Sequence, residues 1–194
     1  MNFFFVCKPL GIPRHVSITA PYRLLGGRNM ATTALKGNPI HTNGDLPTIG
    51  SKAPDFLLVA TDMSEKKLAD FGGKKKILSI NPSYDTPVCQ VATRTFNERA
   101  AGLDDVVVLM VSADLPFAQK RFCAAEGIEG VIPVSTFRGT FLRDYGVELI
   151  DGPLKGVSAR AIVVLDENDK VVHTELVPEI AQEPNYDAAL AAVS

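Results

Sequence analysis

Residues 74–102, KKKILSINPSYDTPVCQVATRTFNERAAG, are predicted to form one strand–loop–helix unit. Residues 74–80 begin with lysines and continue as an apolar run, which indicates a buried strand. A helix is expected over residues 86–102, because Asp85 or Thr86 is a suitable N-cap and a glycine stands where the helix would end. The loop between these two elements is short, so strand and helix are expected to pack together.

The rest of the chain continues this alternation of strands and helices. Residues 105–114 form a continuous apolar run, which is typical of a strand covered on both faces. The other expected elements are a hairpin around Asn38-Pro39, strands at 56–62 and 131–136, helical segments at 68–71, 116–126, 141–146 and 186–193, and two strands at 160–166 and 170–177 joined by a turn.

The order of these elements predicts the fold class. Strands that alternate with helices imply right-handed crossovers and a mostly parallel central sheet. The last two strands should add an antiparallel edge, so the sheet is expected to be mixed. A β-α-β half followed by a β-β-α half resembles the thioredoxin layout. We therefore expect an α/β protein of thioredoxin-like fold, with a mixed, mostly parallel sheet flanked by helices and an N-terminal β-hairpin.

The composition excludes several classes of function. Of the 194 residues, 46% are apolar and 22% are charged, and the net charge is −2. No run approaches the ~20 apolar residues of a membrane-spanning helix. The three histidines lie far apart in sequence and form no metal-ligand pattern. We therefore expect no nucleic acid, no membrane, no metal and no organic cofactor.

The first part of the chain differs from the rest in charge. No acidic residue precedes Asp45, so the first 44 residues carry +5 and the remainder −7, which sum to −2. Two interpretations of residues 1–29 remain open: a targeting peptide, or disordered or untranslated sequence ahead of a real start at Met30. We favour the second, and expect one domain at 30–194. The expected compartment is the cytoplasm, with the periplasm as the alternative.

The number and spacing of the cysteines limit the roles that they can have in this protein. Cys7 lies in the doubtful leader, which leaves Cys89 and Cys123. There is no C-x-x-C and no zinc pattern, and two cysteines are too few for a secreted disulfide scaffold. The two are therefore either buried apolar residues or a redox pair.

Cys89 is placed for reactivity. It lies in the first turn of the predicted helix, where free N–H groups and the helix macrodipole stabilise an anion. The thiolate is the reactive form of cysteine and is favoured in such places. Thr86, three residues earlier, is within hydrogen-bonding reach of the sulfur. These features favour a reactive cysteine over a structural one.

Cys123 and Arg160 are less informative by themselves. Cys123, in PFAQKRFCAAEG, is typical of a core residue. A disulfide needs Cα atoms within about 7 Å, so cysteines on separate helices must unwind locally to pair. Any pairing of Cys89 with Cys123 therefore predicts a conformational change. Arg160 begins a predicted strand, and it is a candidate site residue only if the fold brings it beside Cys89.

Three segments, in this order, resemble one protein family. Residues 82–89, PSYDTPVC, match the peroxiredoxin pattern P-x-x-x-T-x-x-C. SADLPFAQKRFC (112–123) resembles the hallmark of the thiol peroxidase subfamily, the atypical two-cysteine peroxiredoxins. Residues 151–169, DGPLKGVSARAIVVLDEND, are similar to the same subfamily. The likeness covers roughly residues 31–194.

This resemblance implies a thiol-specific peroxidase that reduces hydrogen peroxide and organic hydroperoxides. Cys89 would be the peroxidatic cysteine, with Pro82, Thr86 and Arg160 as its activating shell, and Cys123 would be the resolving cysteine. The resemblance also implies a Cys89 sulfenic acid, an intramolecular Cys89–Cys123 disulfide, thioredoxin as reductant and a homodimer.

Two rival functions remain open. A thiol–disulfide oxidoreductase on the same fold is disfavoured, because C-x-x-C is absent and the cysteines are 34 positions apart. A non-catalytic redox sensor would use the same disulfide as a switch. Steady-state turnover of peroxide distinguishes an enzyme from a sensor.

Overall fold

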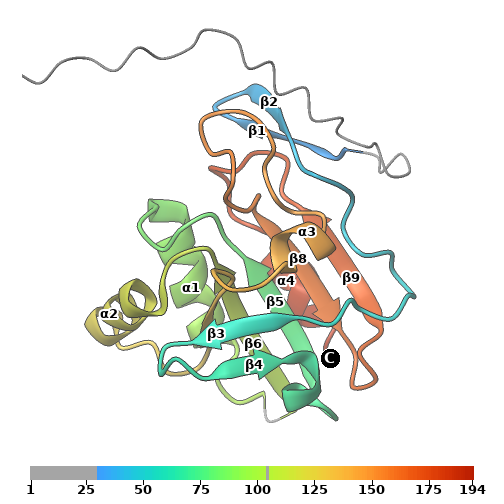
Figure 1. Cartoon of the computed structure of the whole chain (residues 1–194). Helices are drawn as coiled ribbons and strands as arrows, with labels where there is room; N and C mark the ends of the chain where they lie inside the picture. The colour runs from blue at the N-terminus through green and yellow to red at the C-terminus, as the bar shows by residue number, and fades with distance from the viewer. Residues whose placement is uncertain (1–29, 104) are drawn as a thin grey trace, which may run out of the picture.

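The computed structural model describes residues 30–103 and 105–194, so the expected leader at 1–29 lies outside the described residues. A small antiparallel hairpin and a seven-stranded sheet of order β4-β3-β7-β6-β5-β8-β9 form its frame (Figure 1). The strands are β1 (Thr32–Leu35), β2 (Asn38–His41), β3 (Leu57–Ala60), β4 (Glu65–Lys67), β5 (Lys75–Ile80), β6 (Val106–Ser112), β7 (Ile132–Ser135), β8 (Ala161–Leu165) and β9 (Val171–Leu176). The helices are η1 (Leu68–Phe71), α1 (Pro87–Arg99), α2 (Pro116–Glu126), α3 (Phe141–Asp144) and α4 (Tyr186–Ala191).

The predicted elements are all present, although the ends of several differ by one to three residues from the expected ones, and one strand was not predicted. Strand β4 was not predicted, because its three residues, Glu-Lys-Lys, have no apolar pattern and pair with β3 only across a tight turn. Helix α1 ends at Arg99 rather than at Gly102. In the described part of the chain, no helix has the length and apolar character needed to cross a bilayer.

The sheet is mixed, as predicted, but only its centre is parallel. Strands β5, β6 and β7 run parallel and are connected through α1 and α2. The pairings β3–β4, β3–β7, β5–β8 and β8–β9 are antiparallel. The sheet therefore has fewer parallel pairings than expected. A helical crossover is what makes neighbouring strands parallel, and only the two connections through α1 and α2 supply one between adjacent strands.

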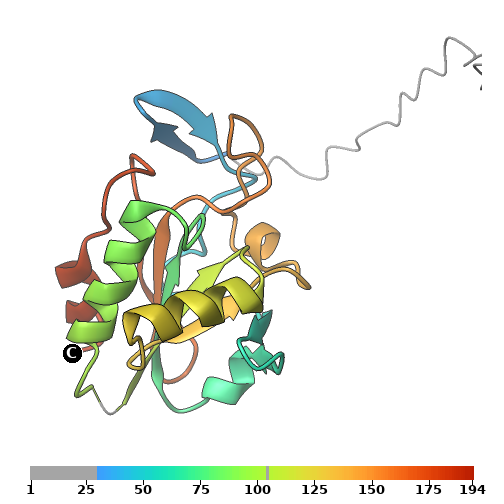
Figure 2. The ribbon, with the colours of Figure 1, turned by 90° about the vertical axis from the view of Figure 1, so that its left-hand side faces the viewer.

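Alternate strand residues face opposite sides of the sheet and form two cores. Ile77 and Val108 face α1, α2 and α4, whereas Leu78 and Leu109 face η1 and α3. Figure 2 shows α1 and α2 side by side over the first of these faces. The helices that carry Cys89 and Cys123 therefore share one face of the sheet.

The strand registers bring three distant segments to one edge. Ile80, the last residue of β5, is opposite Val111 of β6 and Ala161 of β8. The residues that follow β5, those that follow β6 and those that precede β8 therefore meet at the carboxyl end of β5. In α/β sheets, this is where ligands bind.

Candidate active site

Cys89 is the third residue of α1 and is buried, with 1% of its surface exposed. Strand β5 ends one residue before Asn81, and the buried Pro82 then turns the chain toward the helix. Thr86 has extended backbone angles (φ −98°, ψ 140°), and Pro87 begins the helix without needing an amide hydrogen. The short loop thus places the sulfur in the first turn of α1, as predicted.

Thr86 is the N-cap residue, but its side chain does not cap the helix. No first-turn amide donates to its hydroxyl. Instead, Oγ1 lies 2.8 Å from the Cys89 Sγ and 3.1 Å from the carbonyl oxygen of Ser83. A hydroxyl has one hydrogen, so it can donate to only one of these acceptors at a time. A thiolate is the stronger acceptor, and Thr86 is therefore placed to stabilise the ionised sulfur.

Arg160 approaches the same sulfur from a different part of the chain. Its Nη2 donates to the Cys89 Sγ at 3.3 Å, its Nη1 to Asn81 Oδ1 at 2.8 Å and its Nε to the carbonyl oxygen of Ile180 at 2.9 Å. The guanidinium group is therefore held by three partners on three segments. The structure answers what spacing left open: Arg160 does lie beside Cys89.

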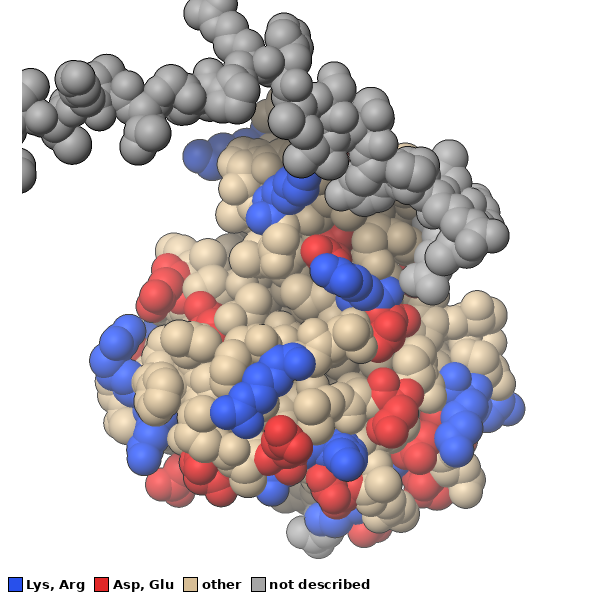
Figure 3. Space-filling model, viewed as in Figure 1, with Lys and Arg blue, Asp and Glu red and all other residues tan. Residues whose placement is uncertain are grey.

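Among the described residues, Arg160 forms no ion pair with a carboxylate. The residue is 1% exposed. A buried charge is costly unless it is paired, and arginine remains protonated at all physiological pH values. Its Nη2 contacts the Cys89 sulfur, so a thiolate at this position would be paired with Arg160. On the surface, by contrast, Lys and Arg are interspersed with Asp and Glu over the face in Figure 3.

Asn81 is a site residue that the sequence analysis missed. Its amide oxygen accepts from Arg160, its Nδ2 donates to the carbonyl oxygen of Ser79 at 3.0 Å, and its own carbonyl oxygen accepts from Ser158 Oγ at 2.7 Å. The available signal was its place directly after a buried strand, where polar residues of α/β proteins gather at the ligand-binding edge.

Cys123 lies elsewhere, in the last turn of α2. Its carbonyl oxygen accepts from the amides of Gly127 and Ile128, which end the helix around a left-handed glycine (φ 63°). The thiol is half-buried, and burial raises its pKa to about 11. At neutral pH it is therefore protonated in this conformation.

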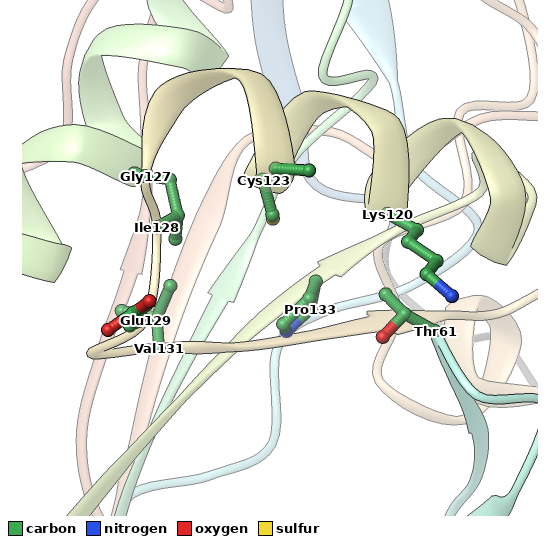
Figure 4. A pocket seen from close by; sticks show the side chains of 9 residues that line it. Thr61, Lys120, Cys123, Gly127, Ile128, Glu129, Val131 and Pro133 are labelled. Atoms are coloured by element: carbon green, nitrogen blue, oxygen red, sulfur yellow. The ribbon is translucent and has the colours of Figure 1, made fainter.

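The Cys123 side chain faces a pocket of about 320 Å³ that Cys89 does not line. Figure 4 shows Cys123 and Lys120 extending from α2 over this pocket, with Pro133 and Thr61 on its other side. Cys89 and Cys123 are both free thiols. The structure thus assembles Cys89, Thr86 and Arg160, with Pro82 in the loop before them, but does not bring Cys123 to them.

Tyr84 is close to both cysteines. Its hydroxyl donates to the carbonyl oxygen of Met110 at 3.2 Å. The centroid of its ring lies 5.2 Å from the ring centroid of Phe122, the residue before Cys123. Burial raises the pKa of Tyr84 well above its ordinary value. This buried ring therefore occupies space between the Cys89 loop and α2.

Comparisons with known proteins show the family to which the chain belongs. Residues 48–190 match the model of the Redoxin family. The chain is 57% identical over 164 residues to the thiol peroxidases of Mycobacterium bovis and Mycobacterium tuberculosis, covering 84% of this chain and 99% of each relative.

Solved structures give the same picture. A peroxiredoxin-like protein from Aquifex aeolicus is 43% identical, with a TM-score of 0.80, covering 86% of this chain and 98% of that one. A thiol peroxidase from Chromobacterium violaceum, at 21% identity and a TM-score of 0.77, covers 85% of this chain and 96% of its own. At this lower identity the second likeness shows the fold.

Proposed function

The chain belongs to the Redoxin family and is a thiol-dependent peroxidase of the peroxiredoxin type, and we propose that Cys89 is its peroxidatic cysteine. The observation that carries this proposal is the buried Cys89 sulfur, contacted by the Thr86 hydroxyl and by an Arg160 that pairs with no carboxylate among the described residues. The proposed substrates are hydrogen peroxide and organic hydroperoxides.

In the first step, the Cys89 thiolate attacks one oxygen of the hydroperoxide. A sulfur–oxygen bond forms as the oxygen–oxygen bond breaks, and the attacked oxygen keeps its hydrogen as the hydroxyl of a sulfenic acid. The other oxygen leaves as alkoxide or hydroxide and takes a proton from water. The sulfur loses two electrons and the peroxide gains them. Thr86 and Arg160 donate hydrogen bonds to the charge that moves from sulfur to oxygen.

In the second step, the Cys123 thiol attacks the sulfenic sulfur of Cys89. A disulfide forms, and the sulfenic hydroxyl leaves with the thiol proton as water. The last turn of α2 must unwind for this step, because Cys123 and Cys89 lie on separate helices. The hydrogen bonds that the Gly127 and Ile128 amides donate to the Cys123 carbonyl oxygen are among those that have to break.

The disulfide is then reduced by a dithiol, for which we propose thioredoxin. Its two thiols become a disulfide, and the two electrons restore Cys89 and Cys123 as thiols. We also propose a homodimer. Support comes from the start of α2, where Leu115 and Phe117 are 51% and 66% exposed, unusual for large apolar side chains next to a buried site.

A coupled assay with hydrogen peroxide, thioredoxin, thioredoxin reductase and NADPH tests this function. We expect sustained turnover by the wild type, none by Cys89→Ser, and a single oxidation without recycling by Cys123→Ser. Full activity of Cys89→Ser would refute the peroxidatic role. Unchanged turnover of Cys123→Ser would refute the resolving role, and a wild type that oxidises only once would instead be a sensor.

A further inference from the structure

We propose that Asp114 is a positioning residue that holds the turn of residues 83–86 and thereby sets Thr86 against the Cys89 sulfur. The inference rests on the proposed function, because it concerns the same sulfur. Asp114 lies in the segment SADLPFAQKRFC, whose Cys123 is the proposed resolving cysteine. The contacts of the Asp114 carboxylate assign it the positioning role.

The Asp114 carboxylate is bonded entirely to neutral donors. It accepts from Ser83 Oγ at 2.8 Å, from the Tyr84 amide at 2.7 Å and from Ser112 Oγ at 2.9 Å. It takes part in no ion pair within the described ranges. Hydrogen bonds to an ionised acceptor are about twice as strong as neutral ones. A half-buried carboxylate with this partner set organises the loop around it.

The turn of residues 83–86 also fixes the position of Thr86. The carbonyl oxygen of Ser83 lies 3.1 Å from both the amide nitrogen and the hydroxyl of Thr86. The same hydroxyl is 2.8 Å from the Cys89 Sγ. Since Asp114 holds Ser83 by its side chain and Tyr84 by its amide, it determines where the Ser83 carbonyl lies. Its loss would let Thr86 move relative to the sulfur.

The position of Asp114 follows from the parallel register of β5 and β6. The Asn81 amide donates to the carbonyl oxygen of Val111 at 2.8 Å, so the segments after both strands run on side by side. The network continues into α2, because buried Gln119 donates from Nε2 to Ser112 Oγ and to the carbonyl oxygen of Val134, each at 3.0 Å. Asp114 is thus anchored to the helix that carries Cys123.

The experiment measures the first chemical step alone. In a Cys123→Ser parent, a sulfenic-acid-trapping reagent and mass spectrometry give the rate constant for Cys89 oxidation by hydrogen peroxide. The variants are Asp114→Ala and Asp114→Asn. The matched control is Asp85→Asn, which removes an exposed carboxylate from the same loop. Hydrogen exchange of the peptides covering residues 81–89 and 161–165 is followed in each protein.

Asp114→Ala is expected to slow Cys89 oxidation about tenfold or more, because small misplacements of catalytic groups are costly. Asp114→Asn, whose amide oxygen can still accept from the Tyr84 amide, is expected to stay within about threefold of the parent, as is Asp85→Asn. Exchange at 81–89 should rise in Asp114→Ala, while exchange at 161–165 should not. A merely structural role would instead lower overall stability and leave the rate constant unchanged.

Two results would overturn the inference: an Asp114→Ala protein that oxidises as fast as the parent, or Asp114→Ala and Asp85→Asn proteins that slow equally. Failure of the proposed function is a different result, since the parent itself would then form no sulfenic acid at Cys89. In that case the hydrogen-exchange pattern still reports whether Asp114 holds the turn.

Discussion

The guanidinium of Arg160 and the sulfur of Cys89 are 71 residues apart in sequence and 3.3 Å apart in the fold. The antiparallel pairing of Ile80 with Ala161 places Arg160 at the end of β5. There the Asn81 amide oxygen accepts a hydrogen bond from the Arg160 Nη1. Because Asn81 is neutral, it orients the guanidinium without cancelling its charge. The full positive charge of the buried Arg160 therefore remains available to stabilise a negative charge on the Cys89 sulfur.

Replacing Asn81 by aspartate keeps the shape of the side chain but should slow the reaction of Cys89 with peroxide. The new carboxylate would pair with Arg160 and repel the thiolate, and we expect the peroxide step to slow about tenfold or more. Asn81→Ala, which removes a partner without adding charge, should be less impaired. Single-turnover oxidation of Cys89 measures both. If Asn81→Asp were as fast as the wild type, Arg160 would not act through its charge.

The Thr86 hydroxyl is expected to matter more than the Thr86 methyl group. Thr86→Val keeps the shape but loses the hydrogen bond to the sulfur, and a bond to a charged partner is worth about 10- to 100-fold in rate. Thr86→Ser keeps the donor and should retain most of the activity. Rate constants with hydrogen peroxide, measured on both variants, check this. Equal activity of the two variants would assign Thr86 a packing role only.

The pH dependence of disulfide formation should reveal whether α2 unwinds before Cys123 reacts. Within the folded helix, burial raises the pKa of Cys123 to about 11, so less thiolate is present at any given pH than for an exposed thiol. Unwinding exposes the thiol and returns its pKa to about 8.5. We expect the rate to rise about tenfold per pH unit above neutral and to level off near pH 8.5.

Rapid mixing of preformed Cys89 sulfenic acid with buffers of increasing pH gives this profile. The proposed unwinding would be contradicted by a rate that continues to rise until about pH 11, because Cys123 would then be reacting from inside the folded helix.

A separate prediction concerns stability. Lys76 of β5 is fully buried, pairs with Asp169 in the β8–β9 turn and donates to the carbonyl oxygen of Asp166 at 3.3 Å. Asp169→Asn suits the positive φ of this position (63°) equally well but leaves the lysine charge unpaired. We expect a loss of about 3 kcal/mol in the free energy of unfolding, measured by denaturant titration.

Lys76→Met on the Asp169→Asn background should recover much of this loss, because it removes the unpaired charge and keeps an apolar side chain of similar length. A double variant no more stable than Asp169→Asn would mean that the cost comes from the turn and not from the buried charge.

Short-range patterns were sufficient to locate most elements. The lysine-to-apolar run of β5 and the Thr86-Pro87 start of α1 predicted a strand, a loop and a helix with Cys89 in its first turn. Strand β4 and the antiparallel pairing of β3 with β7 were not predictable in this way. Strand direction depends on which segments become neighbours, and that depends on packing of the whole chain rather than on any window of residues.

The sequence by itself therefore determined that Cys89 lies in the first turn of a helix that follows a buried strand, because capping, proline geometry and apolar runs act over a few residues. Only the tertiary structure decided that Arg160, Asn81 and Asp114 gather around that helix start. These residues meet through the registers of β5 with β6 and with β8, which are fixed by burial of both faces of the sheet. The tertiary structure also separated Cys123 from Cys89, because Cys123 points into its own pocket.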